Sequence, residues 1–251
     1  MIIIFLFIMG LAIGSFLNVL IDRLPKEEGI NGRSHCDYCK KTLAWYDLVP
    51  VVSFITLHGK CRYCRKKLSF FYPFVELVTG AMFVWVGYWT NGVINLVLTL
   101  AMVSSLLVIF FADAKYHIIP DSIQVVFFLS GLFLLIVRGL TPGMLVDHLI
   151  GAIVVMFPIL FLFLLTSGKG MGFGDVKFVF SIGFFLGLLN GLIALYIAFV
   201  TGALFGIIAI ISKRKQLKSR IAFGPFLVLG FMSTLFFINE IKYLITIFYR
   251  F

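Results

Sequence analysis

The sequence predicts an all-α polytopic membrane protein with about eight transmembrane helices and a small cytosolic zinc-ribbon-like insert between helices 1 and 2. Three observations lead to this fold class. Of the 251 residues, 61% are hydrophobic and only 13% are charged, with a mean hydropathy of +1.10. Long charge-free runs recur along the chain, and one polar segment with two CxxC pairs interrupts them. A soluble globular protein is closer to half apolar and a quarter charged, so composition excludes that class.

The first predicted helix covers residues 1–21. The opening "MIIIFLFIMGLAIGSFLNVLIDR" has no basic n-region and no small-x-small cleavage site, which indicates a retained span rather than a signal peptide. The later charge-free runs are 70–89 (with one acid), 93–112, 122–137, 149–168, 178–212 and 221–239. A helix needs roughly 20 apolar residues to cross the hydrocarbon, so most of these runs fit one span each.

The run 178–212 is too long for one simple span. It is compatible with one span plus a re-entrant piece, or with two short spans divided at "GLLNG" (187–191). Two spans give eight helices and place four polar segments on one side: 22–69, 113–121, 169–177 and 213–220. These segments hold all but three of the 21 Lys and Arg residues.

The positive-inside rule therefore favours eight helices, with the insert facing the cytosol and both termini outside. The net charge of +10 could also indicate nucleic acid or acidic lipid as a partner. Its confinement to one set of loops favours a topogenic role. The predicted division of the chain is a first transmembrane helix (1–21), a cytosolic insert (22–69) and a transmembrane core (70–251).

The insert carries Cys36 and Cys39 in "CDYC" and Cys61 and Cys64 in "CRYC". Two CxxC pairs at this separation are typical of a zinc ribbon, in which four thiolates form a closed, structural site. An insert of this size cannot build much of a core, and metal binding would supply folding energy. Free thiols or a redox dithiol are the alternatives. No internal repeat is recognised in the chain.

Four acids lie at the predicted cytosolic ends of spans: Glu76, Asp113, Asp121 and Asp175. Acids at membrane depth are costly and are functional candidates, although each could simply face water or pair with a lysine. Asp121 follows a proline and is expected to cap the next helix. Asp113 has no such structural explanation.

Asp175 ends the stretch "GMGFGD", in which glycines allow close backbone approach. The alternative for that stretch is a flexible turn with an N-cap. If Asp113 and Asp175 lie close together, the two carboxylates share a proton. The ionised one can activate water, and the protonated one can polarise a peptide carbonyl, so the pair suits peptide hydrolysis at the membrane boundary.

These motifs, in this order, resemble one family along nearly the whole chain: the type IV prepilin peptidases, bifunctional leader peptidases and N-methyltransferases of the GxGD intramembrane aspartic protease class. The paired cysteines resemble the family's cytosolic zinc domain. The other matching stretches are "GSFLNVLIDRLP" (14–25), "YPFVELVTG" (72–80), "ADAKYHIIPD" (112–121), "GMGFGDVK" (170–177) and "FGPFLVLG" (223–230).

The resemblance implies a bacterial plasma-membrane enzyme whose catalytic aspartates map onto Asp113 and Asp175. Its substrates would be prepilins or pseudopilins of a pilus, type II secretion or competence system, cut after a glycine that ends a basic leader. The new N-terminus would then be methylated with S-adenosylmethionine, and the presence of the cysteine insert favours this second activity. The lipid bilayer is the other expected partner, and nucleic acid is not.

The resemblance also places a substrate or methyl-transfer region, for which the sequence offers no independent signature. Its candidate residues are Gly172, Gly174, Lys177, Glu76 and Asp121. No catalytic role is carried onto Asp121.

Two other functions are compatible with parts of the sequence. A transporter or channel could use Asp113 and Asp175 as a coupling pair, but transporter sites lie near the midplane and the chain shows no matching halves. A zinc-ribbon membrane adaptor would explain the cysteines and leave "GMGFGD" without a role. Replacing Asp175 with Asn separates these readings, because only a peptidase would lose cleavage.

Overall fold

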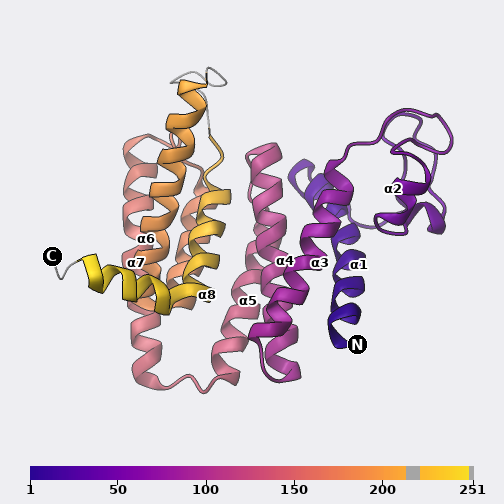
Figure 1. The fold of residues 1–251 in the computed structure, drawn as a ribbon. Helices are drawn as coiled ribbons and strands as arrows, with labels where there is room; N and C mark the ends of the chain where they lie inside the picture. The colour runs from indigo at the N-terminus through magenta and orange to yellow at the C-terminus, as the bar shows by residue number, and fades with distance from the viewer. Residues whose placement is uncertain (213–220, 249–251) are drawn as a thin grey trace. The chain divides into compact units, whose positions relative to one another are not determined.

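The computed structural model describes residues 1–212 and 221–248, apart from a few side chains near the C-terminus (Figure 1). The predicted basic loop 213–220 lies outside the described residues. The chain forms two compact units, residues 1–108 and 109–251. The helices of the first unit are α1 (Ile2–Arg23), η1 (Leu24–Lys26), η2 (Trp45–Leu48), α2 (Val52–Thr56), α3 (Phe71–Trp89) and most of α4 (Val93–Tyr116). The second unit contains the end of α4, then α5 (Asp121–Val137), α6 (Pro142–Leu165), α7 (Phe173–Ile211) and α8 (Gly224–Phe248).

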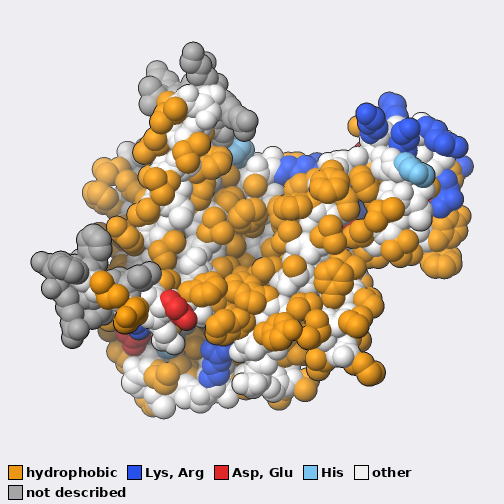
Figure 2. Space-filling model, in the orientation of Figure 1, with side chains coloured by type: hydrophobic (Ala, Val, Ile, Leu, Met, Phe, Trp, Pro, Cys, Tyr) orange, Lys and Arg blue, Asp and Glu red, His pale blue; other side chains and the backbone are white. Residues whose placement is uncertain are grey.

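The described residues contain no β-strand, and six of their helices are long and apolar enough to cross a membrane. These are α1, α3, α4, α6, α7 and α8; α5, with 17 residues, is shorter. Side chains such as Phe157, Phe161 and Leu164 of α6 are exposed, and Figure 2 shows hydrophobic atoms over the helices. A soluble protein would bury such surfaces, whereas a membrane helix turns them toward lipid. The predicted all-α polytopic class is confirmed.

The 39-residue helix α7 doubles back on itself at Gly187 (Figure 1). Gly187 has φ 76° and ψ −177°, which breaks the helix into arms of residues 173–186 and 188–211. A Cβ added to Gly191 would lie only 3.3 Å from the Cα of Gly183, whereas eight residues of straight helix span about 12 Å. The division predicted near 187–191 is therefore present, and with both arms counted the described residues contain eight long helical segments.

Glycines allow α6 and the two arms of α7 to pack closely. A Cβ on Gly183 would collide with the carbonyl oxygen of Gly151 on α6, and one on Gly191 would lie 2.9 Å from Val155. The Nδ1 atom of buried His148 lies 2.7 Å from the carbonyl oxygen of Phe184, next to the turn. Helices without a hydrophobic driving force between them associate through such close contacts, so these glycines hold the hairpin together.

In the first unit, α1 and α3 pack through a GxxxG pair. A Cβ on Gly10 would lie 2.7 Å from the Cα of Gly80, and one on Gly14 would lie 2.8 Å from the Cα of Glu76. The two backbones can approach closely only because these positions lack side chains. This packing places Gly14, the start of "GSFLN" on α1, against the turn of α3 that carries Glu76.

Candidate functional site

Asp113 lies near the end of α4 and is 6% exposed. Its Oδ2 accepts a hydrogen bond of 2.8 Å from the backbone N–H of Gly224, the first residue of α8. A Cβ on Gly224 would lie 2.7 Å from that same oxygen. The start of α8 can therefore approach Asp113 only with glycine at this position, and its free N–H orients the carboxylate.

Asp175 is the third residue of α7 and is 9% exposed. Its Oδ2 accepts a hydrogen bond of 3.1 Å from the N–H of Gly172, so the side chain reaches back over the first turn of its own helix. The other oxygen, Oδ1, is buried and has no hydrogen-bond partner among the described residues. The helix start thus engages only half of the carboxylate.

The two aspartates lie close enough for their charges to interact. Each is oriented through a single oxygen by a backbone N–H at a helix start, Asp113 at α8 and Asp175 at α7. This arrangement orients two acids without using all of their hydrogen-bonding capacity. It can supply one carboxylate as a base toward water and a second as an acid toward a carbonyl.

The N-cap predicted for Asp121 is wrong. Helix α5 begins at Asp121 itself, Pro120 occupies the cap position, and no side chain caps the helix. The Asp121 carboxylate instead accepts hydrogen bonds of 2.7 and 2.8 Å from Lys177 Nζ. Both side chains of this ion pair are exposed, so it contributes only about 0–1 kcal/mol to stability.

Glu76 has a different environment in the first unit. It is 7% exposed on α3, and its Oε2 accepts a hydrogen bond of 2.8 Å from the N–H of Val51 in the insert. The Ser15 side chain of α1 lies near this carboxylate. Val51 has φ 59° and ψ −47°, a strained conformation for a β-branched residue that costs about 1–3 kcal/mol. The hydrogen bond to Glu76 therefore connects the strained residue Val51 of the insert to helix α3.

The four insert cysteines come together as a candidate metal centre. Their Sγ atoms all lie within 4.8 Å of one another, and the Sγ atoms of Cys36 and Cys64 are 3.8 Å apart. Tetrahedral zinc with Zn–S bonds of 2.3 Å separates its sulfurs by about 3.8 Å, so the spacing fits. The Lys66 backbone N–H lowers the pKa of Cys64, but partial desolvation and hydrogen bonds with the other cysteines outweigh it and raise that pKa to about 11.

The two CxxC segments fold into matching knuckles, which the sequence analysis missed. In the first, the N–H of Cys36 bonds to the carbonyl of Lys41 at 3.0 Å; in the second, the N–H of Cys61 bonds to the carbonyl of Lys66 at 2.9 Å. Each knuckle closes with an antiparallel bridge, 35 with 42 and 60 with 67. The signal was present as "CDYCKKTL" and "CRYCRKKL", which align at an offset of 25 residues.

Side chains cross between the knuckles in the same matched manner. Lys41 of the first lies over the ring of Tyr63 in the second at 4.3 Å, and Lys66 lies over the ring of Tyr38 at 4.6 Å. Exposed contacts of this kind contribute about 0.5–1 kcal/mol each. Basic side chains cover this part of the molecule in Figure 2, and two of them have this structural use.

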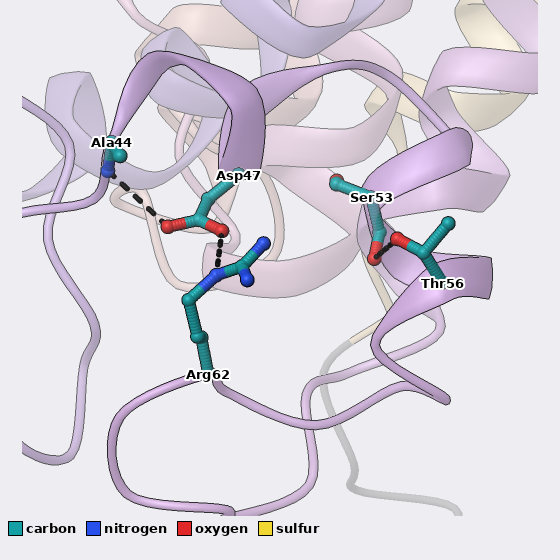
Figure 3. Close-up of polar contacts among 5 residues, drawn as sticks. All are labelled: Ala44, Asp47, Ser53, Thr56 and Arg62. Atoms are coloured by element: carbon teal, nitrogen blue, oxygen red, sulfur yellow. Dashed lines mark hydrogen bonds and ion pairs between the residues drawn. The ribbon is translucent and has the colours of Figure 1, made fainter.

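A polar contact also stabilises the segment between the knuckles (Figure 3). The Asp47 carboxylate accepts hydrogen bonds from Arg62 Nε at 2.7 Å and from the N–H of Ala44 at 3.3 Å. The Thr56 hydroxyl donates to the carbonyl of Ser53 at 3.1 Å. With little apolar core, the insert depends on such contacts for its fold, and a metal ion held by the four cysteines would add to its stability.

The fold and these sites define a polytopic helical membrane protein that joins a four-cysteine insert to a pair of buried aspartates. The model of the bacterial Peptidase A24 N-terminal domain matches residues 8–90, and that of the type IV leader peptidase family matches residues 100–207. No solved structure matches the chain significantly.

Three similar proteins carry the name prepilin leader peptidase/N-methyltransferase. The one from Klebsiella pneumoniae is 36% identical, covering 73% of this chain and 84% of that protein. The one from Bacillus subtilis (strain 168) is 33% identical over 90% of both chains. The one from Burkholderia pseudomallei (strain K96243) is 30% identical, covering 93% and 84%. The chain belongs to the type IV leader peptidase family.

Two residues near the aspartates were not assigned from the sequence. Gly224 stands in the quoted "FGPFLVLG", but only the fold reveals its contact with Asp113. Gln124 is a buried amide on α5 that borders Gly174. Its only sequence signal is that it is a single amide in the apolar run after Asp121.

Proposed function

We propose that this chain is a bacterial plasma-membrane prepilin leader peptidase in which Asp113 and Asp175 are the catalytic pair. The substrate is a prepilin or pseudopilin with a basic leader that ends in glycine, and the leader is removed at the cytosolic face. The observation that carries the proposal is the pairing itself: two buried acids whose charges interact, each oriented by a helix-start N–H through one oxygen.

In this reaction the ionised carboxylate takes a proton from water as the water oxygen adds to the carbonyl carbon of the leader's terminal glycine. The protonated carboxyl donates a hydrogen bond to the carbonyl oxygen, where negative charge develops. The C–N bond then breaks, and the leaving amine receives a proton from the carboxyl that accepted one from water. The glycines at 172 and 174 allow an extended substrate strand to pass close to Asp175.

The second proposed activity is N-methylation of the new N-terminus, with S-adenosylmethionine as the methyl donor. It is assigned to the first unit, where the N-terminal domain match lies. Glu76 and Asn18 are candidates there. Asn18 is buried, its Nδ2 donates to the carbonyl of Tyr72 at 3.1 Å, and its Oδ1 has no partner among the described residues.

The four cysteines are proposed to hold one structural zinc ion through Cys36, Cys39, Cys61 and Cys64. Four thiolate ligands close the coordination sphere, so the ion would stabilise the insert and take no part in peptide cleavage. Under the proposed topology the insert and both aspartates face the cytosol and both termini lie outside.

Purified protein in detergent, incubated with a prepilin and followed by intact mass, tests both activities. Wild type should cut after the leader glycine, whereas Asp113→Asn and Asp175→Asn should not. Addition of S-adenosylmethionine should increase the product mass by about 14 Da, the mass of one added methyl group. The exposed Asp121→Asn serves as the matched control and should cut normally. Cleavage by both Asp113→Asn and Asp175→Asn would reject the assignment of the pair.

A further inference from the structure

Gln124 is an unpaired amide inside the second unit. It lies on α5 and is only 5% exposed. Both its Nε2 and its Oε1 are buried, and neither has a hydrogen-bond partner among the described residues. Buried polar side chains are nearly always paired, because an unmade hydrogen bond leaves the cost of desolvation uncompensated. A side-chain amide with neither atom paired therefore indicates a ligand that supplies the missing hydrogen bonds.

The amide lies beside the aspartate loop. A Cβ added to Gly174 would lie 3.8 Å from Gln124 Nε2 and 3.4 Å from the Cβ of Ile119. Gly174 immediately precedes Asp175, whose Oδ1 is also buried without a partner among the described residues. Helices α5 and α7 are in contact here, so three unpaired polar atoms belong to one small region of the site.

The chemistry of these atoms selects the kind of group that completes them. A primary amide offers two N–H donors and a carbonyl acceptor, and a residue in an extended strand turns its own backbone N–H and C=O to the same side. The two can therefore pair reciprocally. A lone cation would satisfy only the carbonyl oxygen.

We propose that Gln124 is a substrate-binding residue that pairs with the backbone N–H and C=O of one extended substrate residue next to the cleaved bond. Its Nε2 donates to the substrate carbonyl and its Oε1 accepts from the substrate N–H. This inference rests on the proposed peptidase site and adds to it a backbone-recognition element on α5. It requires the substrate to be extended at this point, because a helical peptide group is already paired internally.

The first test compares Gln124→Leu with wild type. Leucine is similar in size but has no polar atoms, so kcat/KM for prepilin cleavage should fall by about tenfold, as expected for the loss of two neutral hydrogen bonds. The thermal midpoint should stay the same or rise, because an unpaired buried amide has been removed. A purely structural role for Gln124 predicts the opposite, a lower midpoint.

Ser130→Ala is the matched control. Ser130 is also a buried polar residue of α5, but its hydroxyl already bonds to the carbonyl of Phe127 at 2.9 Å. Its replacement should leave kcat/KM within about twofold, because no substrate contact is lost. An equal loss in both variants would overturn the proposal.

The second test changes the substrate. Each backbone amide flanking the cleaved bond is replaced in turn by an ester, which removes the N–H donor. At one position the wild type should bind and cut the ester about fivefold less well, whereas Gln124→Leu should treat ester and amide alike there. Equal sensitivity of both proteins at every position would overturn the proposal.

Binding is measured together with cleavage, which keeps the two proposals apart. Cleavage by Asp113→Asn and Asp175→Asn would reject the catalytic pair. The ester effect on binding would still support or reject backbone recognition by Gln124, because binding requires no chemistry.

Discussion

Glu76 in the first unit and the Asp113–Asp175 pair in the second are buried to a similar degree, at 7%, 6% and 9% exposure. Their oxygens are used differently. Glu76 accepts a hydrogen bond from another segment, the Val51 N–H of the insert. Asp175 is held through one oxygen, and its other oxygen has no partner among the described residues.

This difference shows that burial of an acid in a membrane helix does not by itself indicate catalysis. An acid whose oxygens bind the protein's own donors stabilises the fold. An acid that keeps a buried oxygen free retains capacity for water or substrate. In the second unit the acid that keeps such an oxygen is Asp175, through its Oδ1.

The largest expected effect contrasts these acids directly. Asp175→Asn should lower kcat/KM for prepilin cleavage by about 10³-fold or more, because a general acid–base group is lost. Glu76→Gln keeps an acceptor for the Val51 N–H and should cut within about threefold of wild type. Cleavage kinetics on both purified variants measure this, with the Asp121→Asn protein as a reference. A 10³-fold loss of kcat/KM in Glu76→Gln would contradict the proposal that Asp175 is catalytic for cleavage and Glu76 is not.

Removing the candidate metal centre should affect the first unit alone. Cys61→Ser replaces one of four thiolates and should abolish stoichiometric zinc, which elemental analysis of the purified protein would detect. Limited proteolysis within residues 22–69 should increase, while leader cleavage persists. His35→Ala is the control, since His35 adjoins Cys36 but is not part of the sulfur cluster. Retention of one zinc per chain in Cys61→Ser would contradict the four-cysteine site.

Zinc affinity should depend on pH in a defined direction. The metal binds thiolates, and the pKa of the Cys64 thiol is raised to about 11 in the metal-free cluster, so this thiol is protonated at neutral pH. Zinc must displace that proton, and affinity should therefore rise with pH, by about tenfold per unit for each proton released. Competition with a chelator between pH 6 and 8 measures the slope. A flat profile would mean that the thiols are already ionised.

Gly224→Ala tests whether the start of α8 orients Asp113 in the second unit. The added methyl would lie 2.7 Å from Asp113 Oδ2, so the carboxylate or the start of α8 must move. Misplacement of a catalytic group by about 1 Å costs about 100-fold, and kcat should fall on that scale. Gly206→Ala is the matched control, because its methyl would meet only Ile221 at 3.5 Å. Equal activity of the two variants would show that the Gly224 contact does not orient Asp113.

The smallest effect is expected from the exposed ion pair. Lys177→Met breaks the bonds to Asp121, whose side chain is 68% exposed, and should change the free energy of unfolding by less than about 1 kcal/mol. The thermal midpoint and kcat/KM should both remain near wild type. A strong loss of cleavage with an unchanged midpoint would instead place Lys177 in substrate binding, as the sequence resemblance suggested.

Several features were readable from the sequence for clear physical reasons. Charge-free runs of membrane length predicted the spans, and the glycine-rich "GLLNG" predicted the division of α7, since only glycine readily adopts φ 76°. The CxxC spacing predicted the sulfur cluster. The Asp121 cap was predicted wrongly because helix propensity does not report a distant partner such as Lys177, 56 residues away.

The sequence by itself determined the class of the protein, its segments and the acids and thiols available for chemistry, because hydropathy and ligand spacing are local properties. Only the tertiary structure decided which carboxylate oxygens accept hydrogen bonds from the protein and which remain without a partner. The donors are the backbone N–H groups of Val51, Gly172 and Gly224. Two of these donors lie at least 25 residues away in the sequence from the acid that they bind. Such contacts depend on how close two backbones can come, which glycines and helix packing set together and no single segment reveals.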